Sequence, residues 1–151
     1  NTARQMFGAT LRELDSKQDI FIGAAAVADY TPVKPAMKKI KKAEDTITLE
    51  MRKNPDILAA VSQHPKRPFT VGFAAETEDL EQNALNKMKK KELNMIAANL
   101  VGLSDQGFGS SKNELFVFYK RSKSHIARAE KPQVARSLLN LIAKNYKGSK
   151  N

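Results

Sequence analysis

Lysine is the residue type through which this sequence offers most of its chemistry. Five lysines fall within residues 34–42, in the segment KPAMKKIKKAED, and basic residues also gather at 87–91 and 118–123. The formal net charge of the 151-residue chain is +10 at pH 7. A strongly basic surface concentrates anions around it. We therefore expect an anionic ligand, and the 34–42 lysines could form a solvated loop, a nucleic-acid patch or a clamp for one small polyanion.

Two further lysines follow helical spacing. At 100° per residue, a predicted helix over 79–92 places Lys87 and Lys91 in one row with Leu80 and Ala84. The row continues the stripe that packs on the protein, so these lysines are expected to reach past the end of a sheet into a cleft. Alternatively, Lys87 and Lys91 could lie at the rim of the core and extend their apolar stems so that the ammonium groups stay in water. The helical spacing favours the interpretation in which they reach into a cleft.

The lysine-rich segment itself has no helical apolar stripe. Pro32 and Pro35 keep it extended or looped. In an extended chain, Lys39 shares a face with Lys41, while Ile40 takes the other face. A basic loop with one apolar anchor suits a flexible flap, over about residues 31–46, that closes on a triphosphate.

Small residues and one acid follow the first apolar run. In GAAAVADY (23–30), Gly23, Ala24 and Ala25 would let a ligand lie directly against the backbone, although they would equally allow close packing of a helix on a sheet. Asp29 could orient a ribose hydroxyl, an exocyclic amine or a magnesium ion, or could serve as a turn residue. These alternatives stay open from the residues alone.

The segment KNPDIL (53–58) has the features of a helix start. Asn54 is expected as the N-cap, Pro55 at the first helical position and Asp56 in the first turn. Free amides at a helix start attract phosphate, but the charge of Asp56 opposes this. The position therefore suits a nucleoside, a hydroxyl or a metal-bridged phosphate, with plain capping as the alternative.

The elements that must position these residues alternate along the chain. Apolar patterning predicts helices at 1–17, 54–64, 79–92 and 131–147, and strands at 20–28, 46–51, 68–77, 93–100 and 114–120. Both faces of the 20–28 strand are expected to be covered. The alternation indicates a single α/β domain over 1–151, a Rossmann-like three-layer fold with a mostly parallel sheet and helices on both faces. Ligands of such sheets bind beyond the carboxyl ends of the strands.

Several function classes are disfavoured. The chain has no cysteine and only two histidines, so thiolate or zinc chemistry is not expected. No run reaches the roughly 20 apolar residues of a membrane helix, and we expect a soluble, cytoplasmic protein. Motifs of P-loop, dinucleotide-binding, zinc-protease and serine-hydrolase sites are missing, and GFGSS (107–111) is expected to be a turn.

Five segments in this order resemble the phosphopantothenoylcysteine synthetase domain, the ligase half of the bifunctional bacterial coenzyme A biosynthesis flavoprotein. They are GAAAVADY (23–30), KIKK (39–42), KNPDIL (53–58), VGFAAET (71–77) and AANLV with GFGSSKNEL (97–115). The resemblance covers nearly the whole chain. KIKK alone is unspecific, but it is specific in register between the first and third segments.

The resemblance implies a reaction in two steps. CTP and Mg²⁺ activate the carboxylate of 4'-phosphopantothenate as an acyl cytidylate with release of pyrophosphate, and the amine of cysteine then displaces CMP. Lys39 is implied as the catalytic flap lysine that steadies charge on the phosphates, whereas the metal ligands stay open. The residues implied to contact the nucleotide are Gly23, Ala24, Ala25, Asp29, Lys39, Pro55, Asp56, Ile57, Leu58, Phe73, Lys87 and Lys91.

The resemblance also implies what accompanies this domain. Family members begin with a glycine-rich segment whose asparagine handles the acyl intermediate, and nothing before Asn1 supplies it. We therefore expect an N-terminally incomplete domain that binds nucleotide while synthesis is partial or lost. The fused decarboxylase is not in this sequence, so flavin is not expected, and a homodimer is. A basic nucleic-acid-binding α/β module is the alternative function, and a dinucleotide-binding reductase domain is disfavoured.

Overall fold

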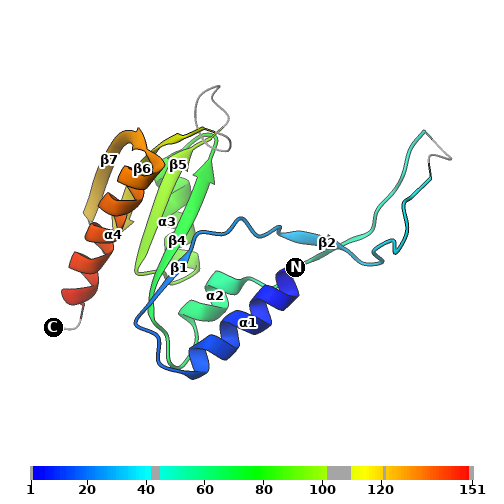
Figure 1. Ribbon diagram of the computed structural model, residues 1–151, viewed down its shortest axis with the longest axis horizontal. Helices are drawn as coiled ribbons and strands as arrows, with labels where there is room; N and C mark the ends of the chain where they lie inside the picture. The colour runs from blue at the N-terminus through cyan, green and yellow to red at the C-terminus, as the bar shows by residue number, and fades with distance from the viewer. Residues whose placement is uncertain (1, 42–44, 102–109, 121, 150–151) are drawn as a thin grey trace.

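A computed structural model describes residues 2–41, 45–101, 110–120 and 122–149 (Figure 1). The predicted closing helix over 131–147 is confirmed, and the other predicted helices are confirmed with shorter bounds. The elements in chain order are α1 (Ala3–Asp15), β1 (Ile20–Gly23), β2 (Tyr30–Pro32), β3 (Met51–Lys53), α2 (Ile57–Ser62), β4 (Phe69–Glu76), α3 (Leu80–Lys90), β5 (Met95–Leu100), β6 (Lys112–Tyr119), β7 (Ser122–Glu130) and α4 (Lys131–Lys147).

Five strands form the main sheet in the order β1-β4-β5-β6-β7. β4 pairs in parallel with β1 and with β5, while β6 runs antiparallel to both of its neighbours. Four of the five strands consequently point the same way, which confirms the mostly parallel sheet. The sequence prediction missed β7, because SKSHIARAE contains one large aliphatic residue and forms a strand by pairing with β6.

Helices cover both faces of this sheet, so the predicted three-layer α/β fold is confirmed (Figure 1). Alternate residues of the strands face opposite layers. On one face, α4 packs on β4, β5 and β6 through the buried residues Val71, Met95, Ala97, Leu115, Val117, Val134, Leu138 and Ile142. On the other face, α3 and α2 cover the buried residues Ala74, Ile96, Ala98 and Phe118. α1 packs on α2 through Leu14, Ile57 and Val61.

β1 is shorter and more exposed than predicted. It ends at Gly23 instead of residue 28, and Ile22 is 37% exposed, so the expectation of a strand covered on both faces was wrong. A run of alanines offers little apolar area to hold a strand on the sheet, and the Ala24 N–H donates to the carbonyl of Ile22 as the chain turns away. β4 continues to Glu76, and among the described residues nothing extends the β1 pairing along Phe73–Glu76.

The lysine-rich segment forms an arm between β2 and β3. These two strands pair antiparallel, Tyr30 with Lys53 and Pro32 with Met51, and the chain between them projects from the body (Figure 1). The strand predicted over 46–51 was therefore wrong except at its last residue, because the arm has no sheet face on which alternating side chains could be buried. Part of the predicted flap, residues 42–44, lies outside the described residues, as do residues 107–109 of the predicted turn.

None of the helices in the described residues is both long enough and apolar enough to cross a membrane.

Candidate functional site

A cavity of about 510 Å³ lies at the carboxyl edge of the sheet, where β1 ends and β4 continues. It is bounded by the loop after β1, the start of α2, the last turns of α3, and the ends of β4 and β5. The structure brings to this cavity eleven of the residues predicted for the nucleotide site, namely Gly23, Ala24, Ala25, Asp29, Pro55, Asp56, Ile57, Leu58, Phe73, Lys87 and Lys91.

Lys39 is the predicted site residue that does not line the cavity. It lies in the exposed arm between β2 and β3, as do Lys38 and Lys41, whereas Lys42 falls outside the described residues. The arm starts and ends next to the cavity, because Asp29 precedes β2 and Lys53 ends β3. The catalytic role of Lys39 stays a prediction.

Asn54 was predicted to be the N-cap of the helix that is α2, but this prediction was wrong, and Asn54 instead holds the loop after β1. Its side-chain Nδ2 donates to the carbonyl of Ala28 at 2.8 Å, and its backbone N–H donates to the carbonyl of Asp29 at 2.8 Å. Gly23 also packs closely, since an added Cβ would lie 3.1 Å from Leu58 Cδ1. Close packing and access to the cavity thus coexist at this glycine.

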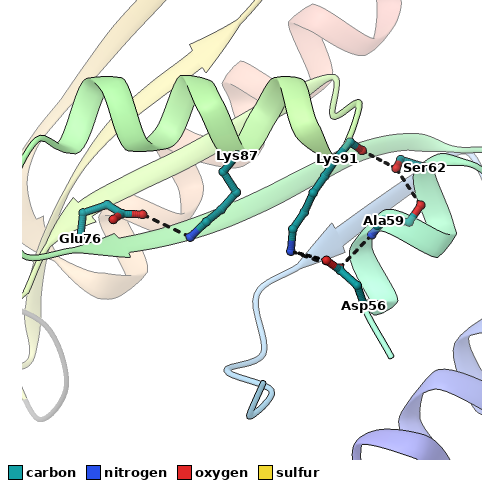
Figure 2. Close-up of polar contacts among 6 residues, drawn as sticks. All are labelled: Asp56, Ala59, Ser62, Glu76, Lys87 and Lys91. Atoms are coloured by element: carbon teal, nitrogen blue, oxygen red, sulfur yellow. Dashed lines mark hydrogen bonds and ion pairs between the residues drawn. The ribbon is translucent and has the colours of Figure 1, made fainter. Parts of the chain in front are cut away.

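Asp56, predicted in the first turn, is instead the N-cap of α2, so Pro55 precedes the helix and the prediction of its place at the first helical position was wrong. Its Oδ1 accepts a hydrogen bond from the N–H of Ala59 at 3.1 Å, and its carboxylate pairs with the ammonium of Lys91, with Oδ2 at 2.9 Å (Figure 2). Burial acts to raise the pKa of this carboxyl. The hydrogen bonds from Lys91 and from the α2 amide, with the positive charges of Lys91 and Lys53, outweigh burial and hold the pKa of Asp56 below its ordinary value.

Lys87 has its own carboxylate partner, which the sequence reasoning missed. Its Nζ donates to Oε1 of Glu76 at 3.2 Å. Glu76 ends β4 and points towards α3, and Figure 2 shows Lys87 and Lys91 leaving the same side of that helix. The buried Ala84 lies in the same helical row. Both lysines reach the cavity, and each is held by an acid from another element.

Four further polar residues that line the cavity were also missed. They are Lys53, Asn99, Asn113 and Lys131. Lys53 is the last residue of β3 and Asn99 the last but one of β5, so the reasoning that located Asp29 beyond a strand end could have included them. Asn113 and Lys131 could not be found in that way, because their position depends on β7, which pairs Asn113 with Ala129 and carries the chain back to the start of α4. Within the described residues, neither Lys53 nor Lys131 has a carboxylate within ion-pair distance.

Comparison with known proteins decides the family. Residues 1–146 match the family described as the DNA/pantothenate metabolism flavoprotein C-terminal domain, or DFP. The chain belongs to this family. The DFP assignment confirms the resemblance inferred from the sequence motifs.

Three similar proteins illustrate the relationship. The DFP chain is 47% identical over 141 residues to the Coenzyme A biosynthesis bifunctional protein CoaBC of Vibrio cholerae. The matched region covers 91% of this chain and 35% of the length of that relative. A crystal structure of the C-terminal domain of such a CoaBC protein superposes with a TM-score of 0.74 at 26% identity, covering 99% of this chain and 64% of that one. A Cab2 mutant in complex with phosphopantothenate-cysteine shares the fold, with a TM-score of 0.60 at 17% identity over 87% of this chain and 46% of that one.

Proposed function

We propose that this DFP domain acts in coenzyme A biosynthesis as a phosphopantothenate–cysteine ligase that uses CTP. The observation that carries the proposal is the cavity, because eleven positions at which the resemblance implies nucleotide contacts line one space at the carboxyl edge of the sheet. The similarity to Coenzyme A biosynthesis bifunctional protein CoaBC supports the same pathway.

The first proposed step joins a substrate carboxylate to CTP. A carboxylate oxygen of 4'-phosphopantothenate attacks the α-phosphorus, and pyrophosphate leaves with the electron pair of the broken P–O bond. Lys87 and Lys91 line the cavity with ammonium groups that would stabilise negative charge on the phosphate oxygens. Lys39, carried by the arm, would add positive charge when the arm covers the site.

The second proposed step forms the amide. The amine nitrogen of cysteine attacks the acyl carbonyl carbon, CMP leaves, and the nitrogen loses a proton. Gly23, Ala24 and Ala25 leave room for the nucleotide to lie against the backbone, while Phe73 and the start of α2 offer apolar surface to the cytosine ring. These residues would bind the reactants and orient them towards each other, and such positioning provides much of the rate acceleration of a bimolecular reaction.

The residues present fit a magnesium ion that arrives with the triphosphate. Mg²⁺ retains several waters and binds through one or two carboxylates plus substrate phosphates. Asp29 and Asp56 are the carboxylates that line the cavity, and Asp56 is already paired with Lys91. In the described ranges, no three His, Cys, Asp or Glu side chains gather into a metal cage. Mg²⁺ would supply charge neutralisation to the phosphates, with Asp29 as the carboxylate available to it.

A homodimer is part of the proposal, and the arm supports it. Large apolar side chains of the arm stand in solvent, with Met37 96%, Ile47 64%, Ile40 57% and Leu49 55% exposed. Exposed apolar surface of this kind is typical of interfaces. Light scattering after size exclusion should give twice the mass of the chain, and a monomer at micromolar concentration would contradict the assembly.

Calorimetric titration tests nucleotide binding. We expect heat from CTP with Mg²⁺, and about ten-fold weaker binding for Lys87→Gln, which removes one charge-assisted phosphate contact. Lys89→Gln is the matched control, since Lys89 is exposed on α3 and does not line the cavity. ATP and a short oligonucleotide are titrated in parallel. The ligase proposal fails if CTP gives no heat while the oligonucleotide binds wild type and variants equally, which is the result that a nucleic-acid-binding module predicts.

Turnover is tested separately by pyrophosphate release with CTP, 4'-phosphopantothenate and cysteine. Lys39→Gln should lower kcat more than it raises KM, because a flap lysine acts on charge that develops during transfer. The assay uses this chain and a version preceded by the family's glycine-rich segment. Equal turnover by the two would contradict the expectation that the segment completes the site.

A further inference from the structure

Glu76 stands out because it touches the cavity only through another side chain. Its side chain is 15% exposed, and its carboxylate accepts a hydrogen bond from Lys87 at 3.2 Å. Lys87 lines the cavity, whereas Glu76 is not among the lining residues. Asp56 is different, because it lines the cavity itself while pairing with Lys91.

We propose that Glu76 is a positioning residue that holds the Lys87 ammonium towards an anion in the cavity. The proposal deepens the function given above, and its choice of CTP as a ligand rests on that function. A lysine ammonium has three N–H donors. One bonds to Glu76, which leaves two for phosphate oxygens. The ion pair thus presents a lysine whose side chain is already ordered, so less conformational entropy is lost when the anion binds.

Two effects of Glu76 oppose each other. Its negative charge repels an anion, while its hydrogen bond orders Lys87. Positioning should prevail, because Glu76 lies outside the lining and an entering anion meets the Lys87 ammonium first. Protein kinases use the same arrangement, in which a glutamate from another element holds a lysine that binds nucleotide phosphates.

The partial burial of the pair sets it apart from surface ion pairs. The side chains of Lys87 and Glu76 are 36% and 15% exposed. On the same helix, Glu81 pairs with Lys123 at 3.0 Å, but these side chains are 55% and 67% exposed. The second pair does not reach the cavity, so Glu81 offers a matched control for Glu76.

The test is a double-mutant cycle, measured by calorimetry with CTP–Mg²⁺ and, separately, with inorganic tripolyphosphate. Glu76→Gln preserves the shape of the side chain and removes its charge. We expect it to weaken binding of either probe about five-fold, the effect of losing one charge-assisted hydrogen bond. In a Lys87→Gln background the same change should have no further effect, and Glu81→Gln should alter affinity less than about two-fold.

The cycle separates positioning from a merely structural role. A structural role for Glu76 would weaken binding equally in both backgrounds, which would overturn the proposal, as would tighter or unchanged binding in Glu76→Gln. Glu76→Asp, which keeps the charge and retracts the carboxylate, provides the same cycle with a smaller loss if the glutamine variant does not fold. If tripolyphosphate shows the coupling and CTP does not bind, the proposed function fails and the role of Glu76 stands. If Lys87→Gln changes the binding of neither probe, the role of Glu76 is refuted.

Discussion

Gly72→Ala should destabilise the protein through two leucines that pack on the sheet. Gly72 lies in β4, opposite Gly23 of β1. A Cβ at this position would lie 2.7 Å from Leu93 Cδ1 and 2.8 Å from Leu58 Cδ2. Carbon atoms in contact prefer separations of about 3.5–4.0 Å, so both leucines must retreat by roughly 1 Å. Since Leu58 approaches from α2 and Leu93 from the loop between α3 and β5, one side-chain rotation cannot relieve both contacts.

The magnitude follows from overpacking and backbone entropy. Overpacking a core costs about 1–3 kcal/mol. A smaller unfolded-state effect of alanine, about 0.4–1 kcal/mol, partly offsets this. We expect a net loss of about 1–2 kcal/mol in the free energy of unfolding, which for a domain of this size lowers Tm by roughly 2–8 °C. Leu58 also lines the cavity, so binding of any ligand there should weaken as well.

Thermal and urea unfolding check this prediction, with Gly8→Ala as the control. Gly8 lies within α1, and an added Cβ there meets only Arg12 Nη1, at 3.5 Å. The same substitution should therefore stabilise the protein by about 0.5–1 kcal/mol, the helix preference for alanine over glycine. The reasoning is refuted if Gly72→Ala is as stable as wild type, or if both substitutions shift Tm in the same direction.

Three more predictions concern stability. The pKa of Asp56 lies below its ordinary value of about 3.9, so its pairing with Lys91 stabilises the fold above that pH and is lost as pH falls through the lower pKa. In urea unfolding between pH 2 and 7, the free energy of unfolding of Asp56→Asn should therefore fall less steeply towards acid pH than that of the wild type. Ser62 is fully buried and donates to the carbonyl of Lys91, so Ser62→Ala should cost about 1–3 kcal/mol in the same assay, and an unchanged urea midpoint would contradict this contact. Leu138→Ala should cost about 2–5 kcal/mol and Leu139→Ala less than about 0.5 kcal/mol, because the first side chain is 5% and the second 54% exposed; equal losses would refute the assigned α4 face.

The sequence predicted well where local pattern and tertiary packing agree. The α4 range follows from an apolar stripe that is also the one buried on the sheet, through Val134, Leu138 and Ile142. The prediction that Lys87 and Lys91 reach a cleft held for the same reason, since Ala84 in their helical row is buried and both lysines line the cavity. In both cases the residues that favour the helix also bury its face.

Prediction failed where pairing or termination depends on distant residues. β7 forms because it pairs with β6, and its own residues carry too little apolar area for the sequence to predict a strand. β1 ends at Gly23 although the apolar run continues to residue 28, since the loop after it is tied instead to Asn54. The acid partners of the two lysines were hidden for the same reason, as Glu76 and Asp56 lie 11 and 35 residues from Lys87 and Lys91.

Asp56 shows why structural and functional interpretations of one residue need not compete. The sequence placed Asp56 in the first turn of a helix capped by Asn54 and also in a candidate ligand site, and the structure gives its carboxylate two simultaneous contacts, one with the α2 amide and one with Lys91. Ser62, at the other end of α2, donates to the backbone carbonyl of the same lysine (Figure 2). Lys91 is consequently attached to both ends of α2, so a shift of that helix would move the ammonium. Residues that stabilise the junction between α2 and α3 are therefore the residues that set the geometry of the cavity.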